Sequence, residues 1–245
     1  MPDTRLSVAT WNVHKCRGTR GFRPDDVAHA ITRLGVEVLA LQEVDRRFGR
    51  QRGTGLIHPA LIAATGMHPV PISLRPNGLG WHGNAILLRN GLHAVAVERI
   101  DLPGAEPRGA VAVDVVRTGA DQTTRPTRAV RFVAVHLGLL ASSRRLQARA
   151  IQDWLAVMPS RPTVLLGDTN EWRPIGALRG LIGAEGHCGR AGPSFPSGLP
   201  IFGFDRIIGL GGVSVRSRHV VDDPIVATVS DHLPVSAVIE AFHEA

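Results

Sequence analysis

Polar residues that could do chemistry recur in this chain directly after apolar, strand-forming stretches. The residues in this position are Asn12, Glu43, His136, Asp168 and Asn170. Each one alone is more often a turn residue or a hydrogen-bonded structural residue, because Asn and Asp favour turns. Their recurrence after separate strands is harder to explain as turn chemistry. In open α/β sheets the crevice outside the strand ends is the usual ligand site, so we expect these residues to share one site.

The stretch Thr163–Trp172 shows this pattern most clearly. Its apolar residues are bounded by Pro162 and Gly167, which predicts a short buried strand. Asp168 and Asn170 therefore emerge where that strand leaves the sheet. A buried carboxylate is costly unless it binds a metal or accepts hydrogen bonds, so we interpret this strand end as one wall of the site.

Further acidic residues stand at the start of two later strand-like stretches, namely Asp205, and Asp231 with His232 beside it. Carboxylate and carboxamide oxygens without cysteine suit Mg²⁺ or Mn²⁺, not a structural zinc. A histidine beside carboxylates supplies a general base, and a second histidine or an amide can stabilise developing negative charge. The chain contains no Gly-x-x-x-x-Gly-Lys loop, nucleophilic-serine elbow or dinucleotide fingerprint. Metal-assisted hydrolysis of a phosphate ester is the reaction class that uses all these groups.

The elements that must position these residues begin with a β-α-β unit. Leu6–Thr10 predicts a strand, and Val36–Leu41 predicts a second one. Between them, Pro24 opens a helix with Asp25 and Asp26 in its first turn, where acidic groups favour the helix dipole. This order implies a crossover connection between the two strands.

The rest of the chain predicts mostly short strands. We expect them at Val70–Leu74, Ala85–Arg89, Ala94–Ile100, Ala110–Val116, Val130–Val135, Arg206–Leu210, Val213–Val215 and Pro234–Ala241. Helices are expected at Leu56–Ala64 and at Pro174–Leu181. A third helix is expected after Ser142, which can cap it. Its apolar stripe consists of Leu146, Ala150, Ile151, Trp154 and Leu155, and Arg145 and Arg149 are expected on its exposed face. Glu185–Gly203 is rich in glycine and proline and is predicted to be irregular. No linker or repeat is visible, so we expect one α/β domain over residues 1–245.

Length and composition favour a soluble globular protein. With 245 residues, 44% of them hydrophobic, the chain can bury a sizeable core. No apolar stretch is long enough to cross a bilayer, and the N-terminus has no signal-peptide pattern. Two cysteines, Cys16 and Cys188, do not make a disulfide framework. We expect a cytoplasmic protein and a monomer.

The formal net charge is +7, from 28 basic and 21 acidic residues, and Lys15 is the only lysine. A basic surface favours anionic partners such as nucleic acid, phospholipid or small phosphate esters, although compositional bias explains it equally well. Two loops that follow predicted strands are rich in arginine: Arg17, Arg20 and Arg23, and Arg46, Arg47, Arg50 and Arg52. We expect both loops to rim the mouth of the site, where arginine suits phosphate recognition; the alternative is a solvated loop.

Seven short motifs occur in order along the chain. They are Thr10-Trp11-Asn12, Leu41-Gln42-Glu43-Val44, Gly83-Asn84-Ala85, Val135-His136-Leu137, Gly167-Asp168-Thr169-Asn170, Asp205-Arg206-Ile207 and Ser230-Asp231-His232-Leu233-Pro234. Each motif alone is weak, but together they resemble the endonuclease/exonuclease/phosphatase superfamily, and the resemblance covers the whole chain. It implies a four-layer α/β/β/α sandwich, in which two packed mixed β-sheets are flanked by helices, with the site at one end.

The resemblance also implies a role for each site residue. Glu43 is the principal ligand of Mg²⁺ or Mn²⁺, with Asn12 beside it and Asp231 near or on the metal. His232 activates the attacking water and is oriented by Asp205. The resemblance further implies that Asp168 orients the nucleophile, that Asn170 and His136 hydrogen-bond the phosphoryl oxygens, that Glu106 orients His136, that Arg108 binds phosphate, and that Asn84 either contacts substrate or only supports the strand start.

The substrate is less determined than the reaction. A histidine at position 136 is a point of resemblance to the pancreatic-type nucleases and the phospholipid-cleaving members of the superfamily. The chain has no tyrosine, and the resemblance to the abasic-site repair enzymes is therefore disfavoured. We expect hydrolysis of a phosphodiester in a small or lipid-derived substrate, with a phosphomonoester, nucleic acid or anionic lipid as alternative partners, and a non-catalytic binding module as a lesser alternative. Trp11 and Trp172 are expected to pack in the core, whereas Trp81 is the candidate for a substrate contact. Glu171 and Trp172 have no assigned role in the chemistry.

Overall fold

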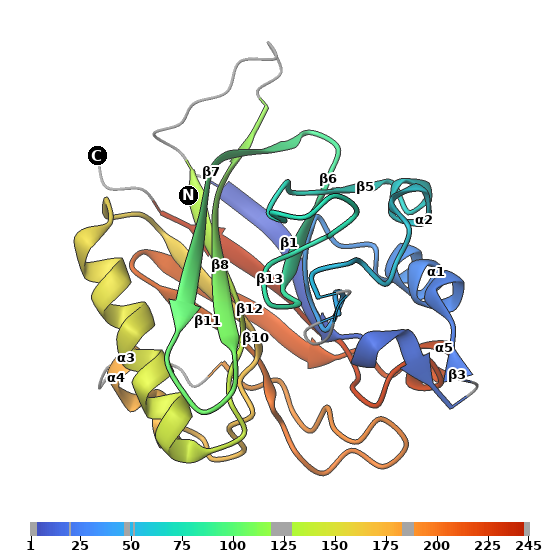
Figure 1. Cartoon of the computed structure of the whole chain (residues 1–245). Helices are drawn as coiled ribbons and strands as arrows, with labels where there is room; N and C mark the ends of the chain where they lie inside the picture. Colours follow the sequence, from blue (N-terminus) through green and yellow to red (C-terminus); the bar gives the residue numbers. More distant parts are fainter. Residues whose placement is uncertain are drawn as a thin grey trace.

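Two β-sheets packed face to face form the centre of the computed structural model, and helices cover both outer faces (Figure 1). The structure describes residues 4–19, 21–46, 50, 52–118, 129–182 and 189–242. The layers therefore run helices, sheet, sheet, helices. This is the expected four-layer α/β/β/α sandwich.

The first sheet has six strands in the order β12-β13-β1-β4-β6-β5. They are β1 (Thr4–Asn12), β4 (Val38–Gln42), β5 (Met67–Pro69), β6 (Ala85–Arg89), β12 (Val213–Val220) and β13 (Val235–Ala241). The second sheet has five strands in the order β11-β10-β9-β8-β7. They are β7 (Leu92–Leu102), β8 (Arg108–Arg117), β9 (Val130–His136), β10 (Thr163–Asp168) and β11 (Asp205–Leu210).

The helices are fewer than the strands, and most of them are short. They are α1 (Pro24–Leu34), α2 (Pro59–Ala64), α3 (Ala141–Val157), α4 (Arg179–Ile182) and α5 (Pro224–Ala227), with 3₁₀ turns η1 (His14–Cys16) and η3 (Gly176–Leu178). A two-stranded hairpin, β2 (Arg17–Gly18) with β3 (Gly21–Phe22), follows η1. None of the helices in the described part of the chain is long and apolar enough to span a membrane.

Alternation of apolar side chains along the strands produces three core layers, because successive strand residues point to opposite faces of a sheet. In β1, Leu6 and Val8 face the second sheet and pack between the two sheets. Ala9 and Trp11 face the other way and pack against α1. On the far side, the second sheet packs against α3 through side chains such as Ile151. Both faces of both sheets are therefore covered.

Parallel pairing at the centre of each sheet brings the polar strand ends together. β1 pairs with β4 in parallel, which confirms the predicted crossover through α1. β9 pairs with β10 in parallel, and His136 stands opposite Asp168 in that register. Since parallel strands end on the same side of a sheet, Asn12 and Glu43 meet at the strand ends of the first sheet, and His136 and Asp168 meet at the strand ends of the second.

Gly167 allows β10 to deliver Asp168 at this edge. Its φ is +151°, a backbone conformation that other residues rarely adopt. A Cβ at this position would also overlap the backbone carbonyl of Val135 on the neighbouring strand. The glycine that ends the apolar run is thus required by close backbone approach, not only by turn chemistry.

Three sequence expectations about elements are wrong. Val70–Leu74 is not a strand, because Pro71 lacks a backbone N–H for the ladder; the strand is β5, just before it. Ser142 does not cap α3, whose N-cap is Leu140 and which shows no side-chain cap. Leu146 is 56% exposed, because the inward face of α3 is instead formed by Ser143, Gln147 and Ile151. Arg145 and Arg149 are exposed, as expected.

Candidate active site

A cavity of about 400 Å³ lies where the central strands of both sheets end. It is lined by Asn12, His14, Lys15, Glu43, Glu106, Arg108, His136, Leu139, Asp168, Asn170, Phe195, Phe204, Asp231 and His232. Nine of these were site candidates from the sequence alone, and a tenth, Asp205, lies behind His232. Asn84, the eleventh candidate, does not line the cavity either.

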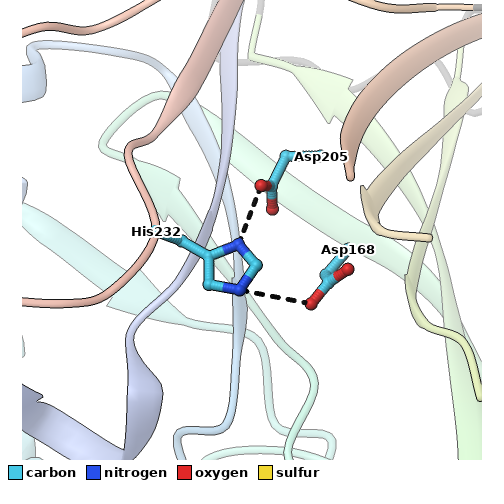
Figure 2. Close-up of side chains that lie close together, drawn as sticks. All are labelled: Asp168, Asp205 and His232. Carbon is cyan, nitrogen blue, oxygen red and sulfur yellow. Dashed lines mark hydrogen bonds and ion pairs between the residues drawn. The ribbon is translucent and has the colours of Figure 1, made fainter. Parts of the chain in front are cut away.

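His232 lies between two carboxylates (Figure 2). Its Nδ1 is 2.9 Å from Asp205 Oδ2, and its Nε2 is 3.8 Å from Asp168 Oδ2. Asp205 is fully buried, and the same Oδ2 accepts a 2.6 Å hydrogen bond from the hydroxyl of Ser194. The Asp205 contact fixes the orientation of the imidazole ring and turns Nε2 toward the cavity and Asp168.

The electrostatic surroundings of His232 favour its protonated form. Burial disfavours the imidazolium, but the carboxylates of Asp205, Asp168 and Asp231 outweigh burial and raise the pKa of His232 to about 10. Phe195 also packs against the ring, with centroids 4.8 Å apart. The imidazole of His232 therefore lies between carboxylates and against the ring of Phe195.

Asp168 is the point where both sheets meet in the cavity. Its Oδ2 accepts a 3.0 Å hydrogen bond from Asn12 Nδ2 in the first sheet and lies 3.4 Å from His136 Nε2. Its Oδ1 accepts a 2.9 Å hydrogen bond from the backbone N–H of Asn170. The side-chain amide of Asn170 in turn donates to the carbonyl of Leu137. Asp168 is thus held by three neighbours, which fixes the position of its carboxylate.

Lys15 and His14 lie next to two further carboxylates that line the cavity, those of Glu43 and Asp231. Lys15 Nζ is 3.4 Å from Glu43 Oε2, and His14 Nδ1 is 3.4 Å from Asp231 Oδ1. His14, Lys15 and Cys16 all have positive φ, between 44° and 57°, as does Glu43 at 61°. Left-handed conformations cost about 1 kcal/mol or more each for residues other than glycine, and they cluster at functional sites.

Three of the residues that line the cavity fit a divalent cation. Glu43, Asp231 and Asn12 supply hard oxygen donors of the kind that Mg²⁺ and Mn²⁺ prefer. Asn12 Oδ1 accepts one hydrogen bond, 3.0 Å from the backbone N–H of His14, and an amide oxygen has a second lone pair. Lys15 Nζ lies near Glu43 and compensates part of its negative charge. The metal-ligand roles of these residues stay a prediction.

A second group could also hold a metal by spacing alone. The donor atoms of Asp168, Asp205 and His232 all lie within 4.8 Å of one another. Asp205 Oδ2, however, already accepts a hydrogen bond from the hydroxyl of Ser194 and lies at hydrogen-bond distance from His232 Nδ1. We therefore interpret this group as a proton relay and keep the predicted metal ligands as Glu43, Asn12 and Asp231.

Glu106 and Arg108 form an ion pair at the edge of the cavity, with Arg108 Nη2 2.9 Å from Glu106 Oε2. Glu106 Oε1 also accepts a 3.3 Å hydrogen bond from the backbone N–H of Leu139. Asn84 is fully buried and donates a 2.8 Å hydrogen bond to the carbonyl of Gly109, next to Arg108. This geometry supports a structural role for Asn84, while the orientation of His136 by Glu106 stays a prediction.

Glu171 organises the loop after β10. Its carboxylate accepts hydrogen bonds from the backbone N–H groups of Arg173 and Ala177 and lies 3.4 Å from Arg144 Nη2. These contacts outweigh the effect of burial and hold the pKa of Glu171 below its ordinary value. Trp172 is 52% exposed, so the expectation that it packs in the core is wrong. Trp11 is fully buried, as expected, and its indole N–H donates to the carbonyl of His232.

Sequence reasoning missed five residues that line the cavity: His14, Lys15, Leu139, Phe195 and Phe204. A signal was available for Lys15, because it is the only lysine in the chain. Phe195 and Phe204 lie in or beside a stretch that forms no regular element, and no periodicity marks them. Of the arginines in the two basic loops, Arg20 and Arg47 lie outside the described residues.

Comparison with known proteins agrees with this geometry. Residues 9–232 match the model of the Endonuclease/Exonuclease/phosphatase family. The uncharacterized protein YbhP of Escherichia coli K12 is 31% identical over 274 aligned residues, which cover 98% of this chain and 99% of that protein. The match to the family model includes all of the site candidates, from Asn12 to His232.

Solved structures share the fold. A functionally unknown conserved protein from Enterococcus faecalis V583 has a TM-score of 0.74 at 19% identity, covering 96% of this chain and 100% of that one. D. rerio TDP2, complexed with a single-strand DNA product, has a TM-score of 0.70 at 17% identity, covering 98% and 100%. Since the family model matches most of the chain, the protein belongs to the endonuclease/exonuclease/phosphatase family.

Proposed function

We propose that this protein is a divalent-metal-dependent hydrolase that cleaves a phosphodiester in a small or lipid-derived substrate. One observation carries the proposal: His232 and Asp168, backed by the buried Asp205, line the same cavity as the hard-oxygen group of Glu43, Asn12 and Asp231. Water activation and charge compensation, the two requirements of phosphoester hydrolysis, are thus supported by groups within one site.

The geometry supports a distinct task for each residue of the relay. Asp205 holds His232 Nδ1, so that Nε2 is free to take a proton from a water between it and Asp168 Oδ2. Asp168 accepts the second hydrogen bond of that water and orients it. His136 and Asn170 line the same cavity and hydrogen-bond the phosphoryl oxygens as negative charge develops.

A divalent cation bound by Glu43, Asn12 and Asp231 would acidify water and stabilise phosphoryl charge. Positive charge next to Asp231 would also offset part of the carboxylate field on His232. The pKa of His232 would then fall toward its ordinary value, which a general base requires. Lys15 and Arg108 add fixed positive charge on either side of the cavity.

Two alternatives remain for the substrate and the activity. A DNA or RNA endonuclease is favoured by the net charge of +7 and by the fold shared with a protein that binds a single-strand DNA product. Such an enzyme would contact many phosphates, so its binding would weaken steeply with salt. A non-catalytic binding module is disfavoured, because every expected metal and base position carries a functional side chain.

The test is hydrolysis of bis-aryl and mono-aryl phosphates, glycerophosphodiesters, plasmid and RNA by the purified protein with Mg²⁺ or Mn²⁺. We expect turnover of a diester, lost by about 10³-fold or more in His232→Ala and reduced with weaker metal dependence in Glu43→Ala. Thermal unfolding with and without Mn²⁺ provides a second readout: the metal-induced rise in Tm should persist in His232→Ala and disappear in Glu43→Ala.

Different outcomes separate the alternatives. Nicking of plasmid at low salt with no turnover of small diesters would establish the nuclease instead. If no phosphoester is hydrolysed with any divalent metal, the binding-module alternative gains. Full activity of His232→Ala would overturn the assignment of this residue as the base.

A further inference from the structure

Two further cavities are linked to the candidate active site through shared lining residues, and these two together are here called the row. The first, here the middle cavity, has a volume of about 270 Å³ and is lined by Lys15, Arg17, Phe22, Arg46 and Leu56. The second, here the outer cavity, has a volume of about 290 Å³ and includes Arg46, Arg52, Arg75 and Trp81 in its lining. Lys15 lines both the active site and the middle cavity, and Arg46 lines both the middle and the outer cavity. Lys15 and Arg46 are therefore the side chains that link the linings of the three cavities.

Positive charge dominates this row. The middle cavity has three cationic side chains and no acidic one among its lining residues. Asp45 is the single acidic residue in the lining of the outer cavity, and its oxygens accept hydrogen bonds from the backbone N–H groups of Leu79 and Gly80 at 2.9 and 2.8 Å. Its charge is thus directed at the backbone rather than at the cavity.

The arginines of the row also lack acidic partners within the described part of the chain. Arg17, Arg46, Arg52 and Arg75 form no ion pair there. Arginines elsewhere do so, as a series of surface and buried pairs shows: Arg33–Asp223, Arg117–Glu37, Arg131–Asp114 and Arg144–Glu171. Uncompensated positive charge along a concave surface creates a potential that attracts anions.

Backbone pairing holds the two arginines of the middle cavity in place. Arg17 stands opposite Phe22 in the β2–β3 hairpin, which follows β1 and Asn12. Arg46 exchanges backbone hydrogen bonds with Thr54 and Gly53, at 3.0 and 2.7 Å, in the loop that follows β4 and Glu43. The strands that deliver the metal-ligand candidates therefore also set the distance between the active site and the middle cavity.

We infer that the middle cavity is a binding subsite for a second phosphate group of the substrate, next to the phosphodiester that is cleaved. This inference rests on the proposed function. Arg17 and Arg46 supply planar guanidinium groups that match phosphate oxygens, and Lys15 lies between this subsite and the active site. Phe22, which is 47% exposed, offers an apolar surface for the organic group that joins the two phosphates.

Two sources can supply this chemistry, a nucleotide chain and a phosphorylated head group, and matched substrate pairs distinguish them. One pair is the dinucleotide TpT and its 5′-phosphorylated form pTpT. The other is glycerophosphoinositol and glycerophosphoinositol 4-phosphate. Within each pair the scissile diester is the same, and only the second phosphate differs. The pair in which the second phosphate lowers KM identifies the source.

The variants Arg17→Gln and Arg46→Gln test the subsite itself. We expect each to raise KM for the doubly phosphorylated member about tenfold more than for its singly phosphorylated partner, because each removes a charged hydrogen bond to phosphate. The turnover number kcat should change little, and the salt dependence of KM should become less steep. Arg145→Gln is the matched control, since Arg145 is an exposed arginine on α3 outside the row.

Binding measured without turnover separates this inference from the proposed function. Calorimetric titration of His232→Ala with each member of both pairs reports affinity whether or not the chain hydrolyses them. Tighter binding of pTpT than of TpT, or of the 4-phosphate than of its parent, supports the subsite even if no activity is found. Equal affinity within both pairs, or an equal loss for both members in Arg17→Gln and Arg46→Gln, overturns it.

Discussion

Asp205 is the buried residue on which the orientation of His232 depends. It accepts a 2.6 Å hydrogen bond from the hydroxyl of Ser194 and lies 2.9 Å from His232 Nδ1, and neither Asp205 nor Ser194 is exposed to solvent. A carboxylate in this position selects the tautomer in which Nε2 is free for the reaction. Asp168 has a similar positioning role, because it contacts Asn12 from the first sheet and His136 from the second.

Replacing Asp205 by Asn should therefore lower kcat by about 10²–10⁴-fold with little change in KM. The amide keeps the size of the side chain but removes the charge that stabilises the imidazolium. Ser194→Ala is the matched control, because it removes the other partner of Asp205 and should cost about tenfold or less. Circular dichroism verifies that both variants fold. A kcat for Asp205→Asn within about threefold of the native value would contradict the role of this carboxylate.

Lys15 shows how one residue can belong to a site without a motif. The chain contains no other lysine, and the left-handed turn η1 directs Lys15 Nζ to within 3.4 Å of Glu43 Oε2. Lysine is a compact point charge on a flexible stem, whereas arginine presents a planar fork. The ammonium group of Lys15 therefore compensates the negative charge of Glu43 from any direction, whereas the planar guanidinium of an arginine would need one particular orientation.

At the scale of elements, the β10–β11 region carries the polar pair Asp168 and Asn170 on a supported loop. Arg206, fully buried in β11, donates a 2.7 Å hydrogen bond to the carbonyl of Pro174 and further hydrogen bonds to the carbonyls of Glu171 and Arg173. The Glu171 carboxylate binds backbone N–H groups of the same loop. Glu171 and Arg206 thus provide hydrogen-bond partners for backbone N–H and carbonyl groups of the loop. This structural role accounts for Glu171, to which the sequence assigned no part in the chemistry.

Gly167→Ala should destabilise the protein by about 2–4 kcal/mol, because a Cβ would meet the Val135 carbonyl and the φ of +151° is unfavourable for alanine. Activity should fall together with stability, since Asp168 is the next residue. Gly198→Ala is the control: nothing lies within 4 Å of its Cβ position, and its φ is not in the left-handed region. Urea denaturation measures both variants, and equal stability of the two would refute the backbone argument.

Element prediction succeeded where periodicity was strong and local. β6 has the bounds that the sequence predicted, Ala85–Arg89, and α1 begins at Pro24. It failed where tertiary contacts decide, as at Val70–Leu74, which is apolar and partly buried but lacks a continuous ladder around Pro71. The β2–β3 hairpin within the loop of glycines and arginines was not foreseen, because its short strands carry no alternation.

At the scale of the whole molecule, one apolar layer joins both sheets. Its members come from β1, β4, β6 and β13 in the first sheet and from β7, β8, β9, β10 and β11 in the second. The active site lies at the end of this layer and takes residues from both sheets. We therefore expect residues of the two sheets to unfold as one cooperative unit, as the single domain predicted for residues 1–245 would.

Phe132 in β9 tests this expectation, because it is fully buried in the layer between the sheets. Phe132→Ala should lower the free energy of unfolding by about 3–5 kcal/mol while the transition stays single. Tryptophan fluorescence and far-ultraviolet circular dichroism should give coincident curves, since Trp11 packs with α1 on one side and Trp154 with the α3 side on the other. Two separate transitions would show that the sheets unfold independently.

The sequence alone determined the family, the two-sheet class of fold and most of the residues that line the cavity. This was possible because polar residues at strand ends are local features, and their order along the chain is specific. Only the tertiary structure decided which of them meet, with Asn12 bound to Asp168 across the two sheets and Asn84 buried away from the cavity. It also showed the row of cationic cavities, because arginines far apart in sequence converge there through pairing between strands and loops, which no local pattern encodes.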